Sequence, residues 1–151
     1  MLQKRKSLFN KNEKSGDFDL KYIVDAVAFL AYLADNLPKK VNNIFKLAEN
    51  KEVSLYLPSI VLGECLYTIY KGKEVFGKII PAEKIPLIFQ ILQFTDNFHL
   101  ITMSLDAWKM FNENFLPELH DRMILALAME HAATAILTSD PEIQTKYACI
   151  W

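Results

Sequence analysis

Short apolar runs that favour β-strands alternate along this chain with longer stretches whose apolar residues have helical spacing. This alternation constrains the fold most, because strand, helix and strand in succession form a parallel pair through a crossover connection. Strands connected in this way are covered on both faces and are therefore apolar throughout. The pattern predicts a three-layer α/β fold, with helices flanking a mostly parallel central sheet of four to five strands. The predicted strands occupy residues 22–24, 53–57, 98–102 and 134–138, with a last short one at 147–151.

Helices are predicted between these strands from apolar spacing and from capping residues. Ser104 is expected to cap one of them. Residues 71–80 contain glycine and lysine and are expected to form a loop or a helix break. The aromatic residues mostly lie at helical spacing among aliphatic ones, as Trp108 and Phe111 do, and are expected in the core. The predicted helices span residues 26–37, 38–50, 59–70, 84–94, 105–115 and 121–132.

Four acidic residues lie where a parallel sheet would bring them together. Asp25 directly follows the first predicted strand, and Asp140 directly follows the fourth. Asp121 opens the helix that leads into the fourth strand, and Glu64 lies within the helix that leaves the second. In open α/β sheets, ligands bind beyond the carboxyl ends of the strands. We therefore expect the four acids to gather at one edge of the sheet.

Each acid also has a plainer explanation. Asp25 and Asp140 could cap the helices that follow them, and Asp121 could be a first-turn acid that favours the helix dipole. Glu64 is harder to explain in this way, because its helix is mostly apolar and carboxylates are rarely buried without a partner or a metal. The joint placement of the four acids, rather than any single one, indicates a site.

Carboxylates gathered in one place repel one another. Two unit charges roughly 4 Å apart cost about 4 kcal/mol at an effective dielectric near 20. Such a cluster persists where a proton is shared or a cation lies among the oxygens. An all-oxygen set suits Mg²⁺ or Mn²⁺ better than Zn²⁺, and such a cation promotes phosphodiester hydrolysis. We therefore predict one catalytic, metal-binding set: Asp25, Glu64, Asp121 and Asp140.

Four stretches around these acids resemble the PIN domain family. The matching stretches are YIVDAVAFLAYL at 22–33, LPSIVLGECLYTIY at 57–70, LHDRMILALAMEHAA at 119–133 and AILTSD at 135–140. The resemblance covers residues 20–151. It implies a Rossmann-like sheet and an endoribonuclease that cuts single-stranded RNA with Mg²⁺ or Mn²⁺. It also implies that Asp25, Glu64, Asp121 and Asp140 are the metal-binding acids.

Many members of this family are toxins of VapC type, which pair with a small antitoxin protein and often form homodimers. The resemblance therefore implies RNA, an antitoxin and a second copy of the chain as partners. The chain differs from many members directly after Asp25, where Ala26 and Val27 stand in positions that often carry Ser, Thr or Asn. Two alternatives stay open: a catalytically degenerate protein-interaction module, and an RNA-processing nuclease that is not a toxin. The absence of a long helical arch or a DNA-binding hairpin argues against a structure-specific DNA nuclease.

Several other polar residues near these motifs have two interpretations. His120 could be a general base, but is expected as a solvent-facing first-turn residue. Arg122 could hold a phosphate, but is expected on the helix surface, and Glu118 could join the acids, but is expected as a loop residue. Lys71 and Lys73 could guide an RNA strand electrostatically or form a solvated face.

Length and composition set the remaining bounds. The chain has 151 residues and a formal net charge of −1, which suits one domain and excludes a strongly basic nucleic-acid binder. Cys65 is expected as a buried thiol, and the absence of cysteine pairs agrees with a reducing cytoplasm. We expect no membrane span, a folded domain over residues 20–151, and a flexible basic N-terminal extension over 1–19. That extension could be a solvated tail or an arm that contacts RNA phosphates or a partner protein.

Overall fold

The computed structural model describes residues 20–151, which form one parallel five-stranded sheet with helices on both sides. The strand order is β5-β2-β1-β6-β7. The central strand β1 pairs in parallel with β2 on one side and with β6 on the other, so that Ile23 lies opposite both Tyr56 and Ile136. The strands of this sheet are β1 (Lys21–Val24), β2 (Ser54–Pro58), β5 (Phe98–Ile101), β6 (Ala135–Leu137) and β7 (Cys149–Ile150).

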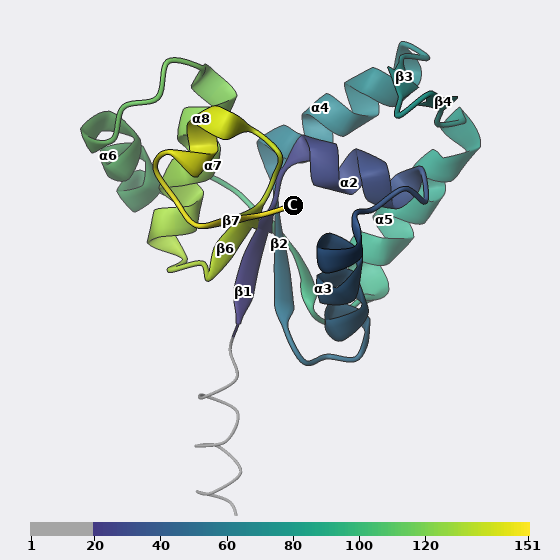
Figure 1. Ribbon diagram of the computed structural model, residues 1–151, viewed down its shortest axis with the longest axis horizontal. Helices are drawn as coiled ribbons and strands as arrows, with labels where there is room; N and C mark the ends of the chain where they lie inside the picture. The colour runs from purple at the N-terminus through teal and green to yellow at the C-terminus, as the bar shows by residue number, and fades with distance from the viewer. Residues whose placement is uncertain (1–19) are drawn as a thin grey trace, which may run out of the picture.

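The helices form the two outer layers. In Figure 1, α2 to α5 lie to the right of the sheet and α6 to α8 to its left. The three-layer α/β architecture predicted from the sequence is therefore confirmed. The helices are α2 (Ala26–Leu33), α3 (Lys39–Glu49), α4 (Ser59–Tyr70), α5 (Ile85–Phe94), α6 (Leu105–Glu113), α7 (Leu119–Glu130) and α8 (Pro141–Gln144), with a 3-10 turn η1 (Ala82–Lys84) before α5.

The core follows from this layering. The central strands are buried on both faces, as expected for a parallel sheet, and β6 is buried at each of its positions. On the α2–α3 side, aromatic rings fill the space between helices and sheet. The rings of Tyr32 and Phe45 are stacked with centroids 4.7 Å apart, and those of Phe29 and Phe98 lie 5.9 Å apart.

The structure differs from the sequence prediction in some details. The segment 71–80, predicted as a loop, contains a small antiparallel hairpin of β3 (Glu74–Val75) and β4 (Lys78–Ile79). The expectation that aromatic residues lie in the core is wrong for Trp108, which is 44% exposed and packs edge-on against Phe111. Helical spacing identifies one face of a helix but does not say whether another element covers that face.

Two predictions concern other properties of the chain. Between residues 20 and 151, no helix is long and apolar enough to cross a membrane. The predicted basic extension at residues 1–19 lies outside the described residues.

The central strand provides a test of the fold. Ile23 is fully buried in β1, so Ile23→Ala is expected to lower the free energy of unfolding by about 2–5 kcal/mol. Leu100, on the edge strand β5, is 47% exposed, and Leu100→Ala should cost less than about 1 kcal/mol. Urea unfolding measures both values. Similar losses for the two variants would contradict the strand order described here.

Candidate active site at the carboxyl edge of the sheet

Asp25 lies at the centre of the site, between β1 and α2. Its backbone N–H donates to the carbonyl of Leu137 in β6 at 3.2 Å, which continues the pairing of the two strands by one residue. Its carboxylate Oδ1 accepts from the N–H of Ala26 at 2.7 Å and caps α2. The side chain is thus both a helix cap and a buried acid, since the residue is only 8% exposed.

Thr138 fixes the second oxygen of Asp25. The fully buried hydroxyl of Thr138 donates to Oδ2 of Asp25 at 2.6 Å and accepts from the N–H of Asp140 at 3.1 Å. One hydroxyl therefore connects the two acids that follow the central strands. The sequence analysis missed this residue, although Thr138 is the first polar side chain after the apolar strand β6, and this position could have identified it.

Burial and hydrogen bonding have opposite effects on the pKa of the Asp25 carboxyl. Burial raises the pKa of its carboxyl, and the hydrogen bonds from Thr138 and Ala26 lower it. The negative charges of Asp140 and Glu118 raise this pKa further. The net direction is upward, so the site favours a proton or a cation at Asp25.

Asp140 and Asp121 form the second part of the site. Asp140 caps the short helix α8, with its Oδ1 accepting from the N–H of Glu142 at 2.8 Å. Burial, the charges of Asp140 and Glu118, and a side-chain hydrogen bond to Asp140 raise the pKa of Asp121 to about 7. The carboxyl of Asp121 is therefore close enough to Asp140 to form a hydrogen bond with it.

Glu118 lies in the loop before α7, as expected, and it also contributes to the acidic cluster. Its carboxylate caps α7 by accepting from the N–H of Asp121 at 2.8 Å. Its charge also raises the pKa values of Asp25, Glu64 and Asp121. Because Glu118 caps the helix, α7 begins at Leu119, earlier than predicted.

Glu64 lies on α4, opposite the start of α7. Its Oε1 is in hydrogen-bond contact with Nδ1 of His120, so His120 is not the solvent-facing residue that the sequence predicts. Burial raises the pKa of Glu64 more than the contact with His120 lowers it, and the charge of Asp25 raises it further. Glu64 therefore belongs to the same electrostatic cluster as the three aspartates.

Arg122 was expected on the helix surface, and its contacts agree with this expectation. Its guanidinium Nε donates to the carbonyls of Phe111 at 2.7 Å and Asn114 at 2.9 Å, at the end of α6. The guanidinium also lies over the Phe111 ring, 4.5 Å from its centroid. Arg122 therefore stabilises the end of α6 and does not neutralise the acids.

The donor set suits a hard cation. The cluster offers carboxylate oxygens, and both nearby thiols are unsuited to metal binding because burial and the acids raise the pKa values of Cys65 and Cys149, the latter to about 11. Within residues 20–151, however, no three His, Cys, Asp or Glu side chains already converge on one point. The acids influence one another's pKa values, but their oxygens do not yet surround one point. Glu64 instead contacts His120.

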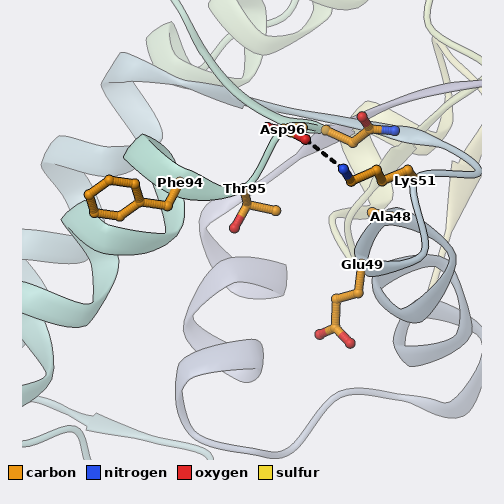
Figure 2. Close-up of a pocket in the computed structure, with 7 residues that line it drawn as sticks. Ala48, Glu49, Lys51, Phe94, Thr95 and Asp96 are labelled. Atoms are coloured by element: carbon orange, nitrogen blue, oxygen red, sulfur yellow. Dashed lines mark ion pairs between the residues drawn. The ribbon is translucent and has the colours of Figure 1, made fainter.

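Within residues 20–151, the opposite edge of the sheet carries no comparable acidic cluster. A hollow of about 300 Å³ lies there, where α3 and α5 lead into β2 and β5. Figure 2 shows Lys51 and Asp96 paired across it at 2.7 Å, with Glu49 turned away. Because both paired side chains are 67% exposed, solvent screens their interaction. Among the described residues, the acidic cluster therefore lies at the carboxyl edge of the sheet.

The fold is a parallel α/β sheet, and acidic side chains lie where its central strands end. This combination is typical of α/β proteins with an acidic site at the carboxyl edge of the sheet. The family model of the PIN domain matches residues 22–148. The chain therefore belongs to the PIN domain family.

Two solved structures have a similar fold. A chain in the structure of VapBC2 from Rickettsia felis bound to a promoter DNA fragment aligns with a TM-score of 0.63 and 18% identity, covering 87% of this chain and 98% of that chain. A chain in DNA-bound VapBC from Salmonella typhimurium aligns with a TM-score of 0.61 and 15% identity, covering 87% and 97%. No curated protein matches the sequence. At these identities the likeness establishes the fold.

Asp121 gives a test of the electrostatic cluster. Its pKa rises on folding from 3.8 to about 7, so the folded state binds this proton more tightly and stability is lost as the pH rises through that window. Without metal, Asp121→Asn should therefore raise Tm by a few degrees at pH 8 and by less at pH 5. Calorimetry measures this. Asp106→Asn is the control because the side chain of Asp106 is 75% exposed. A lower Tm for Asp121→Asn at pH 8 would count against the cluster.

Proposed function

We propose that this protein is an endoribonuclease that depends on Mg²⁺ or Mn²⁺ and hydrolyses phosphodiester bonds of single-stranded RNA. The observation that carries this proposal is the upward pKa shift of Asp25, Glu64 and Asp121, which lie together without a neutralising Lys or Arg in the contacts described above. A cation among these oxygens would relieve the repulsion that raises the pKa values. PIN domain membership agrees with nuclease activity.

The residues that would hold the cation are Asp25, Asp121, Asp140 and Glu64. Asp25 and Asp140 follow the central strands β1 and β6, and both are hydrogen-bonded to Thr138. Glu64 would contribute by leaving its contact with His120. When bound, such a cation lowers the pKa of a water and offsets the charge on the phosphate.

The chain's own groups prepare this site before any substrate binds. The Thr138 hydroxyl and the Ala26 N–H hold the Asp25 carboxylate in one orientation. The Asp121 carboxyl, with its pKa of about 7, carries a proton in part of the molecules at neutral pH. It can release that proton when positive charge enters the site.

The substrate and partner classes rest on the family and on the structural neighbours. Single-stranded RNA is the substrate that the PIN resemblance implies. The neighbours are VapBC complexes, which supports the proposal that this chain is a VapC-like toxin with a small antitoxin partner. A homodimer and a cytoplasmic location belong to the same proposal. An RNA-processing nuclease outside a toxin–antitoxin pair would use the same site.

Substitution of the central acid tests the activity. Asp25→Asn keeps the shape of the side chain but removes its charge, so cleavage of a labelled single-stranded RNA with Mn²⁺ should fall by more than about a hundredfold. Asp96→Asn, in the exposed ion pair at the opposite edge, is the matched control and should cleave normally. Activity that survives both Asp25→Asn and excess chelator would refute the proposal.

Cation binding should depend on pH through Asp121. Because the pKa of its carboxyl is about 7, binding displaces a proton below that pH. The affinity for Mn²⁺ should therefore fall about tenfold for each pH unit below 7 and level off above it. Calorimetric titration at pH 6, 7 and 8 measures this slope, which Asp121→Asn should abolish. The expectation fails if wild-type affinity is constant across this range.

A further inference from the structure

A hollow of about 280 Å³ lies between α4 and the start of α7, directly beside the paired side chains of Glu64 and His120. Its remaining walls are Ile60, Gly63 and Tyr67 on α4. Because Glu64 also belongs to the acidic cluster, the hollow shares one wall with that cluster. Its volume lies below the roughly 300–1,000 Å³ of pockets for drug-sized ligands, which suits a single ring system.

Gly63 keeps this hollow open. A Cβ atom at this position would meet no heavy atom within 4 Å, so neither close packing nor backbone conformation requires a glycine here. Glycine disfavours a helix interior relative to alanine. The missing side chain therefore leaves space in the wall of the hollow rather than a contact with another element.

Tyr67 gives the hollow an aromatic wall with positive charge beside it. The residue is 56% exposed although it lies on an otherwise apolar helix. The ammonium groups of Lys71 and Lys73 lie 5.6 and 5.0 Å from the centre of its ring. Both ammonium groups lie over the ring. An exposed ring with cations close to it matches the way in which proteins bind single-stranded nucleic acid, by stacking on bases and neutralising phosphates.

We propose that this hollow binds one unstacked nucleobase of single-stranded RNA, adjacent to the phosphate at the acidic cluster. Tyr67 supplies the stacking surface, and Lys71 and Lys73 face the neighbouring phosphates. The walls of the hollow are mostly apolar, which suits the flat face of a base. The inference rests on the proposed function, because that function makes RNA the bound polynucleotide. Binding of one base in the hollow would position the RNA strand at the acidic cluster.

The positive charge favours a nucleobase over an apolar peptide as the occupant. An apolar side chain of a partner protein would fill the same space but would gain nothing from the cations beside Tyr67. A polyanion gains from both the ring and the lysines. The peptide is therefore the competing occupant that the experiment has to separate.

Binding measured without cleavage tests the inference. In the Asp25→Asn background, a fluorescein-labelled single-stranded RNA of about 12 nucleotides is titrated by anisotropy, and Tyr67→Leu should weaken binding by about fivefold or more. Tyr67→Trp should retain affinity. Tyr70→Leu is the matched control, because Tyr70 lies three residues further along α4, is 72% exposed and does not line the hollow.

Filling the pocket and removing single bases give two independent readouts. Gly63→Leu should weaken RNA binding by a similar factor while Tm stays the same or rises, which separates pocket loss from unfolding. RNAs with one abasic site at each position in turn should show one position where the loss matches that of Tyr67→Leu. At that position, the loss should vanish in the Tyr67→Leu protein, because the two changes remove the same contact.

Unchanged RNA affinity in both Tyr67→Leu and Gly63→Leu, within twofold of the Tyr70→Leu control, would overturn the inference and leave a protein partner as the occupant. Equal effects of abasic sites at all positions would also overturn it. Failure of the proposed function would look different: the protein with all its acids intact would bind the RNA through Tyr67 but would not cut it with Mn²⁺.

Discussion

The candidate site depends on the parallel pairing of β1 with β6. This pairing places the carboxylate of Asp25 beside the segment between β6 and Asp140. Thr138 turns this adjacency into a fixed geometry, since its single buried hydroxyl donates to one acid and accepts from the backbone of the other. The helices α4 and α7 then bring Glu64 and Asp121 to the same edge of the sheet. The positions of the acids therefore follow from strand order and connection.

The gathering of these acids lowers the stability of the metal-free protein. Burial and like charges raise the pKa values of the acids, so the fold maintains an electrostatic cost at neutral pH. The remainder of the chain offsets that cost with an apolar core around β1 and with helix caps in which the same acids take part. Asp25, Glu118 and Asp140 each cap a helix, so structural and chemical roles coincide in one side chain.

Much of this was predictable from the sequence. The alternation of apolar strands and helices predicted the parallel three-layer fold, and the positions of Asp25 and Asp140 after two strands predicted their common edge. The contact between His120 and Glu64 was not predictable, because it depends on how α7 lies relative to α4. Hydrophobic periodicity fixes which face of a helix is buried, but it does not fix the neighbours of a side chain at the helix end.

Diffraction from crystals grown with Mn²⁺ tests the central claim most directly. Anomalous scattering recorded at the manganese absorption edge locates the cation without reference to activity or to substrate. We expect one or two peaks bounded by carboxylates of Asp25, Asp121 and Asp140, with Glu64 turned away from His120. At saturating Mn²⁺, the absence of a peak at this edge of the sheet, or peaks bound elsewhere by other residues, would contradict the account.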